Sequence, residues 1–272
     1  MNDPYRFVMH GNVGAVRSID ALIVNNKDFL PEFKELYLHE RSFTGSNYIS
    51  PVFSALPLIN HNFEIFLELD ANNHSYQAML SLILGAFLHD IKNIVIHENN
   101  MDDFELTLSL IDDWHKQADD FSLESINKSQ SPADETRLFF NADYEVFEFN
   151  EEVFENLHMA GIEGIFLPEN YDPVKLMNIF NLADEYGLQV FNSASIYTST
   201  RQLKFAIDVI PQLDMPANFI DRMEDSSNKI EEGLQYFREY VDFTKNFDAK
   251  GIIIENPTKK ILQALKRSDI IA

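Results

Sequence analysis

Side chains that can bind a metal or move a proton fall where several predicted strands end. Asp70 ends the segment EIFLELD, and His97 and Glu98 end the segment NIVIHE. Carboxylates and an imidazole on neighbouring strand ends are the groups that a divalent cation or an acid–base reaction needs. Side chains alternate along a strand, however, so His97 and Glu98 should point to opposite faces. Helix capping and solvated loop charge are therefore the competing interpretation of these residues.

A wider set of polar residues follows the same pattern. In a barrel of parallel strands the carboxyl ends meet at one face, which is where barrel enzymes hold their reactive groups. Of the eight His residues, only His10 and His97 lie at predicted strand ends, and both are candidates for a functional role. No nucleophile motif or glycine-rich phosphate loop is present, so the sequence assigns no catalytic residue. The predicted rim comprises Asn25, Asn26, Glu68, Asp70, His97, Glu98, Asp143, Glu169, Asn170, Asn192 and Glu255.

The elements that would position this rim alternate between short apolar runs and segments of helical period, which is typical of βα units around a parallel sheet. Asp172 before Pro173 predicts a helix start, and Gly161 and Gly187 predict helix ends. Six strands are predicted at Glu64–Asp70, Asn93–Glu98, Arg137–Phe140, Gly164–Pro168, Gln189–Ala194 and Gly251–Glu255. Helices are predicted at Tyr76–Asp90, Phe104–Gln117, Val153–Ala160, Val174–Tyr186, Arg201–Ile210, Lys229–Asn246 and Thr258–Lys266.

The first sixty residues are less regular. Tyr5–Met9 and Ala21–Asn25 can supply two further strands, whereas Pro31–His39 and Pro51–Asn60 look helical. Eight strands with right-handed crossovers predict an α/β fold, a single (β/α)8 TIM barrel over residues 1–272, although a doubly wound open sheet fits the same pattern. The polar stretch Ser122–Thr136 is interpreted as an excursion between a helix and a strand, with a domain linker as the alternative.

The composition narrows the classes of partner. With 21 Lys and Arg against 44 Asp and Glu, the formal net charge is −23, which disfavours nucleic acid and membrane surfaces and leaves a small-molecule ligand. The absence of Cys excludes disulfides and thiolate chemistry. No apolar run has the length of a signal peptide core or a membrane span, so a cytoplasmic location is expected. Four aromatic residues at helical spacing indicate core packing or a homo-oligomer contact: Tyr236, Phe237, Tyr240 and Phe243.

The order and spacing of several segments from about Phe63 to the end of the chain resemble methylenetetrahydrofolate reductase. The resemblance is strongest over residues 162–226, and Lys92 to Val95 stand where that family has Arg-Asn-Ile-Leu. The segments that carry it are Asn170-Tyr171-Asp172, Thr198 to Lys204, Leu213 to Pro216, Arg222-Met223-Glu224 and Glu255-Asn256-Pro257-Thr258-Lys259.

The resemblance implies hydride transfer through bound FAD to a folate, in one-carbon or methionine metabolism. It implies a cofactor site at Asn100 with His97 and Glu98, and a substrate site formed by Glu169, Asn170, Met223 and Lys259. No metal ligand is assigned, because capping is favoured for the strand-end residues. The sequence departs from the family's pattern, because Val8 stands where the acid belongs and Asn100 replaces an Asp. A non-catalytic or partner-binding barrel that has lost the flavin site is therefore the second hypothesis, and a barrel with metal or acid–base chemistry at the polar rim is the third.

Overall fold

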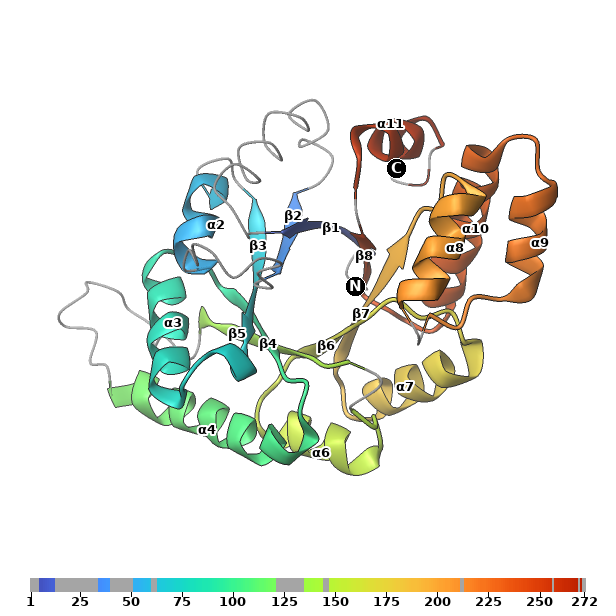
Figure 1. The fold of residues 1–272 in the computed structure, drawn as a ribbon. Helices are drawn as coiled ribbons and strands as arrows, with labels where there is room; N and C mark the ends of the chain where they lie inside the picture. The colour runs from blue at the N-terminus through green and yellow to red at the C-terminus, as the bar shows by residue number, and fades with distance from the viewer. Residues whose placement is uncertain are drawn as a thin grey trace.

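The computed structural model describes residues 5–12, 34–39, 51–59, 63–120, 135–143, 147–210, 213–255, 257–268 and 270. Eight parallel strands pair in chain order, and β8 returns to pair with β1 through Arg6 and Gly251 (Figure 1). This closure confirms the predicted TIM barrel and rules out the open sheet. The strands are β1 (Arg6–Asn12), β2 (Glu35–His39), β3 (Glu64–Asp70), β4 (Asn93–His97), β5 (Arg137–Asn141), β6 (Gly164–Leu167), β7 (Gln189–Ser195) and β8 (Gly251–Glu255).

Helices surround the barrel, as Figure 1 shows. Asp172 caps α7 by accepting hydrogen bonds from the backbone N–H groups of Val174 and Lys175. Gly161 and Gly187 have positive φ angles of 78° and 69°, which explains glycine at these two helix ends. The helices are α2 (Pro51–Ile59), α3 (Tyr76–Leu88), α4 (Phe104–Asp120), α6 (Glu151–Met159), α7 (Pro173–Glu185), α8 (Thr200–Val209), α9 (Ala217–Asp225), α10 (Lys229–Asn246) and α11 (Lys259–Arg267), with 3-10 turns η1 (Ala71–Asn73) and η2 (Met101–Asp103).

Each strand contributes one aliphatic or aromatic side chain to the packed interior of the barrel. Phe166 lies at its centre, with ring centroids 4.7 Å from Phe191 and 5.1 Å from both Phe66 and Tyr37. The stripe of four aromatics on α10 packs into or against the outer core between strands and helices. The eight interior residues are Val8, Tyr37, Phe66, Val95, Phe139, Phe166, Phe191 and Ile253. Because side chains alternate, residues two positions further along each strand face the carboxyl end of the same interior.

The sequence-based assignment of Pro31–His39 as a helix is wrong where the structure describes that segment. Glu35–His39 forms β2, because Leu36 and Leu38 face the helices while Tyr37 faces the interior, a period of two. Helix α9 was not predicted. Asn25, Asn26, the Ala21–Asn25 strand and most of Ser122–Thr136 lie outside the described residues. Within the described part of the chain, no helix is long and apolar enough to cross a membrane.

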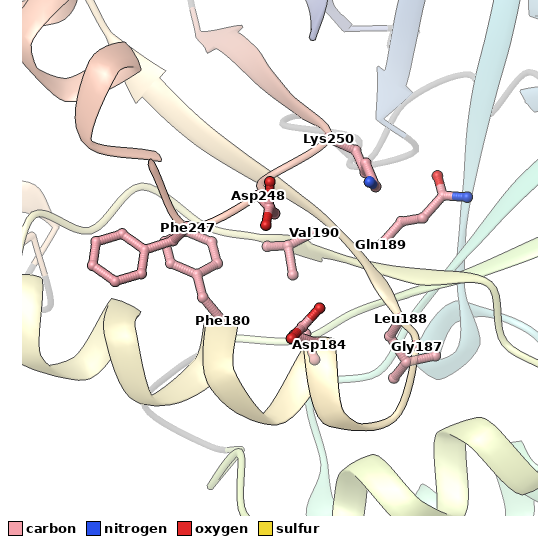
Figure 2. Close-up of a pocket in the computed structure, with 10 residues that line it drawn as sticks. Phe180, Asp184, Gly187, Leu188, Gln189, Val190, Phe247, Asp248 and Lys250 are labelled. Atoms are coloured by element: carbon pink, nitrogen blue, oxygen red, sulfur yellow. The ribbon is translucent and has the colours of Figure 1, made fainter. Parts of the chain in front are cut away.

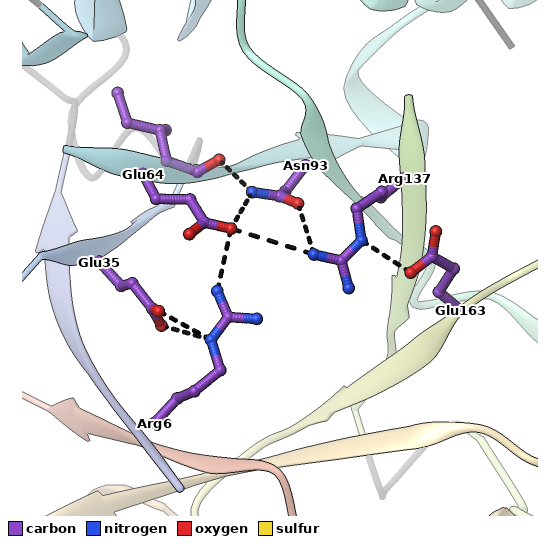
Figure 3. A network of polar contacts seen from close by, with 7 residues as sticks. Arg6, Glu35, Glu64, Asn93, Arg137 and Glu163 are labelled. Atoms are coloured by element: carbon purple, nitrogen blue, oxygen red, sulfur yellow. Dashed lines mark hydrogen bonds and ion pairs between the residues drawn. The ribbon is translucent and has the colours of Figure 1, made fainter. Parts of the chain in front are cut away.

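An ion-pair network fills the amino-terminal end of the barrel (Figure 3). Arg6 Nε donates to both carboxylate oxygens of Glu35 at 2.8 Å, and its Nη2 lies 3.0 Å from Glu64 Oε1. Arg137 Nε donates to Glu163 Oε2 at 2.7 Å, on the other side of Asn93. This end is therefore occupied by mutually paired charges, which leaves the carboxyl end as the place to look for chemistry.

Candidate functional site

The carboxyl end of the barrel interior, called the mouth below, holds a histidine–carboxylate pair on β1 and β8. His10 Nδ1 lies 2.5 Å from Glu255 Oε2, and both side chains are about one-fifth exposed, at 20% and 19%. Burial opposes ionisation of Glu255, but attraction to His10, hydrogen bonds from His10 and Ser193, and the nearby His39 together hold the pKa of this carboxyl below its ordinary range. Glu255 therefore acts as a carboxylate that orients His10.

A second pair of the same kind lies on β2 and β3. His39 Nε2 is 3.3 Å from Glu68 Oε1, and Glu68 is fully buried whereas His39 is 14% exposed. The other oxygen of Glu68 accepts hydrogen bonds from the Tyr37 hydroxyl and, at 3.1 Å, from Asn141 Nδ2. Burial, together with the nearby charge of Glu68, raises the pKa of Tyr37 well above its ordinary value. Tyr37 is consequently a neutral donor that fixes Glu68 beneath the mouth.

The two pairs meet through their imidazoles. The ring centroids of His10 and His39 are 5.6 Å apart with the planes at 75°, and the His10 ring also lies 5.7 Å from Tyr37. Each imidazole thus contacts a carboxylate on one side and the other imidazole on another. Histidine is the side chain best suited to give and take protons near neutral pH, and a carboxylate partner fixes which nitrogen carries the proton.

A third carboxyl group, Glu169, stands between β6 and β7. Its Oε1 accepts from the hydroxyls of Tyr171 at 2.6 Å and Tyr197 at 2.9 Å, and both oxygens accept from Ser195. Burial raises the pKa of Glu169, although the donors from Tyr171, Ser195 and Tyr197 favour its carboxylate form and Glu255 repels it. With four hydrogen bonds from three residues, Glu169 holds the end of β7 in place beside the mouth.

The proposed convergence of Asp70, His97 and Glu98 is not found. Asp70 caps η1 by accepting from the backbone N–H of Asn72 at 3.0 Å. Glu98 is buried and accepts from Thr107 Oγ1 at 2.8 Å and from the backbone N–H of Asn100 at 2.9 Å. His97 is fully buried, and because it lies two residues beyond the interior residue Val95 on β4, it faces the same interior. Among the described residues, no three His, Asp or Glu side chains gather closely enough to hold a metal ion.

The remaining predicted site residues lie apart from one another. Asn100 caps η2, and Asn170 Oδ1 accepts from the backbone N–H of Asp172 at 2.8 Å. Met223 is fully buried in α9, and Lys259 is exposed at the first turn of α11. Of the predicted cofactor and substrate residues, the structure thus places Glu169 and His97 nearest the mouth. Asn192 faces away from the interior and donates to the Tyr240 hydroxyl of α10.

Sequence analysis missed His39, Tyr37, Asn141 and Ser193. His39 was hidden because its segment was assigned to a helix. The alternation of Glu35, Tyr37 and His39 with two leucines is the signal that would have revealed a strand ending in an inward-facing histidine. Asn141 ends β5 one residue beyond the predicted boundary.

A shallow cavity of about 170 Å³ lies at the opposite end of the strands (Figure 2). It is lined by the end of α7, the start of β7 and the turn before β8, including Phe180, Asp184, Asp248 and Lys250. The Phe180 and Phe247 rings stack at 6.0 Å beside it. Conserved chemistry in barrels of this kind is built at the carboxyl end, and this cavity contains no histidine, so the mouth is the stronger candidate.

The fold defines the class of the protein as a (β/α)8 barrel. No family model and no curated protein matches the chain. Solved structures that match it include an aldolase named QR15, at 8% identity and a TM-score of 0.55, covering 98% of this chain and 96% of that one. A tetrameric deoxyribose phosphate aldolase from Aeropyrum pernix matches at 10% identity and 0.56, covering 96% and 89%. Oxaloacetate acetylhydrolase in complex with 3,3-difluorooxalacetate matches at 10% identity and a TM-score of 0.54, covering 99% of this chain and 82% of that one.

These comparisons overturn the resemblance to methylenetetrahydrofolate reductase. Solved structures that match the chain include two aldolases and an acetylhydrolase, and no family model, that of the reductase included, matches. The resemblance rested on the order and length of strands and helices, which every (β/α)8 barrel shares, so its spacing could not discriminate between families. The expectation of flavin-dependent reduction of a folate is therefore wrong. The comparisons do not test binding of FAD itself, which an absorption spectrum would test.

Proposed function

We propose that this protein is an enzyme that moves a proton on a small carbonyl compound held at the mouth, in a reaction of the isomerase or lyase type. The observation that carries the proposal is the contact between His10 and His39, each of them paired with its own glutamate. Two imidazoles held in contact can act as base and acid on neighbouring atoms of one substrate.

The carboxylates decide which nitrogen of each ring takes part. Glu255 contacts Nδ1 of His10, so Nε2 is the nitrogen that accepts a proton from substrate carbon. Glu68 contacts Nε2 of His39, so His39 enters the proposed reaction as an imidazolium whose Nδ1 proton goes to the carbonyl oxygen. His10 takes one proton from carbon and His39 gives one to oxygen, so an α-hydroxy carbonyl compound becomes a neutral enediol. His10 then returns its proton to the carbon that carried the carbonyl group, while His39 takes a proton from the other hydroxyl group, which gives the isomer and restores both imidazoles.

The names of the fold neighbours are compatible with carbonyl chemistry, since two are aldolases. An aldol reaction through a Schiff base would need a lysine amine in the site. Among the described inward-facing residues at the carboxyl ends of the strands there is no Lys. We therefore propose proton transfer by imidazole rather than covalent catalysis by an amine.

Exchange of hydrogen for deuterium tests the proposal without knowledge of the natural substrate. Glyceraldehyde, dihydroxyacetone, their phosphate esters and 2-deoxyribose would be incubated with the protein in D₂O. Loss of the proton signal at the carbon beside the carbonyl would be followed by NMR. We expect exchange with at least one compound, and we expect H10Q and H39Q each to slow it by about 10²-fold or more.

His158 provides the matched control, because it is exposed on α6. H158Q should exchange at the rate of the unsubstituted protein. If no compound exchanges its proton faster with the unsubstituted protein than with H10Q, the proposal is refuted. A compound that binds without exchange would indicate a binding barrel instead. The predicted homo-oligomer is a separate matter, which sedimentation at low and high protein concentration tests.

A further inference from the structure

The ionisable side chains that face the mouth are carboxylates and imidazoles. Two carboxylates, Glu68 and Glu255, stand there with His10 and His39 as their partners. Asp70 continues the same face of β3. The described inward-facing residues at this end include neither Lys nor Arg.

Glu68 is the central member of this set. It is fully buried, and its two oxygens are contacted by the Tyr37 hydroxyl, Asn141 Nδ2 and His39 Nε2. These three groups hold the carboxylate in place, so it cannot turn away from an incoming ligand. A charge in such an environment acts on a bound ligand more strongly than it would through water.

Most described arginine side chains are paired away from the mouth. Arg6 and Arg137 lie in the network at the amino-terminal end of the barrel (Figure 3). Arg222 pairs with Glu232 and Glu239 at the outer helices α9 and α10. A phosphate or carboxylate entering the mouth would therefore meet fixed negative charge from Glu68 and Glu255.

Resting on the proposed function, we infer that the mouth takes an uncharged carbonyl compound bearing hydroxyl groups and discriminates against its phosphorylated form. Hydroxyl groups of such a ligand can donate to Glu68 and Glu255 and accept from the imidazoles. This ligand class differs from the phosphorylated sugar in the name of one fold neighbour and from the dicarboxylate bound to another.

Pairs of compounds that differ only in a phosphate group test the inference. Dissociation constants would be measured for glyceraldehyde and glyceraldehyde 3-phosphate, and for 2-deoxyribose and its 5-phosphate, from the NMR shifts of the His10 and His39 ring protons at pH 7.5. We expect at least one neutral compound to bind about tenfold or more tightly than its ester, and higher salt to narrow the difference.

Removing the charge of Glu68 should weaken the preference for the neutral compound over its phosphate ester. E68Q keeps the size of the side chain and should reduce the preference for the neutral compound several-fold. The control is E98Q, because Glu98 is equally buried but is held by Thr107 and the backbone of Asn100 outside the interior. E98Q should leave the preference unchanged.

The outcomes separate this inference from the proposed function. A phosphate ester that binds as tightly as the neutral compound, or binding by neither member of any pair, would overturn the inference. An ester that binds and exchanges its proton would leave the proton-transfer function standing while removing the ligand class. A neutral compound that binds more tightly than its ester but exchanges no proton would support the ligand class and refute the proton-transfer function.

Discussion

Replacing Tyr37 by Phe tests the polar floor of the mouth. The Tyr37 hydroxyl donates to Glu68 and accepts from Asn141 Nδ2 at 2.9 Å, and the residue is 4% exposed. Its ring stacks on Phe166 at a centroid distance of 5.1 Å, a contact that Phe preserves. Y37F therefore removes two hydrogen bonds and almost no volume.

The expected cost follows from the charge and burial of the partner. A hydrogen bond to a charged group contributes about 1.5–3 kcal/mol, and a buried partner left without its donor adds to the loss. Asn141 keeps its bond to Glu68, so we expect Y37F to lower the free energy of unfolding by about 2–3 kcal/mol. Tyr76 makes a comparable bond to Asp113 between α3 and α4 but is partly exposed, so Y76F should cost about 0.5–1 kcal/mol.

Urea unfolding at pH 7 would measure both variants through the fluorescence of Trp114, which is 1% exposed and so reports on the core. Equal slopes of the unfolding free energy against urea concentration would show that the two variants expose the same surface area on unfolding. If Y37F cost no more than Y76F, the carboxylate of Glu68 would not depend on Tyr37, and the reasoning about the floor of the mouth would fail.

The other predictions concern acid stability, helix packing and the flavin. The pKa of Glu255 is lowered from 4.5 in the folded protein, so its contribution to stability is present above pH 4.5 and disappears as pH falls through the folded value. Thermal unfolding should accordingly show E255Q less stable than the unsubstituted protein at pH 7, with the difference in stability closing as the pH falls below 4.5; a difference independent of pH would contradict this. G233A should cost about 3 kcal/mol, because its Cβ would lie 1.9 Å from the carbonyl oxygen of Tyr197, whereas G85A, with nothing within 4 Å, should gain about 0.5–1 kcal/mol. Urea unfolding would measure the stability of both variants. If G233A and G85A changed the free energy of unfolding similarly, α10 would be able to shift to accommodate the added methyl group. The absorption spectrum of the protein after incubation with FAD and gel filtration should show no flavin band. A retained band would show that the protein binds FAD.

Much of the fold could be predicted from the chain itself. The bounds of β3, β8 and α10 agree with the prediction to the residue, because each is a continuous apolar run or a helical stripe between clear breaks. The prediction failed at β2, where five residues are too few to separate a period of two from a helical turn. It also missed α9, which begins after Pro216 without a side-chain cap.

The candidate site was only partly predictable. Glu68 and Glu255 were placed on the predicted rim and His10 at a predicted strand end, but no pattern in the sequence joined them into pairs. Asp70 and Glu98 belonged to the same rim, yet the structure uses both to accept local hydrogen bonds. A carboxylate at a strand end is as suitable for capping a following turn as for catalysis, so local sequence cannot separate the two uses.

The sequence by itself determined the alternation of strands and helices, the acidic balance and the absence of thiol chemistry, because these depend on residue types and on periods of a few residues. Only the tertiary structure decided that Glu255 meets His10 and that Glu68 meets His39. The first pair joins opposite ends of the chain, and it exists because closure of the barrel brings β8 beside β1. Barrel closure depends on the twist and stagger of all eight strands together, and no short segment contains that information.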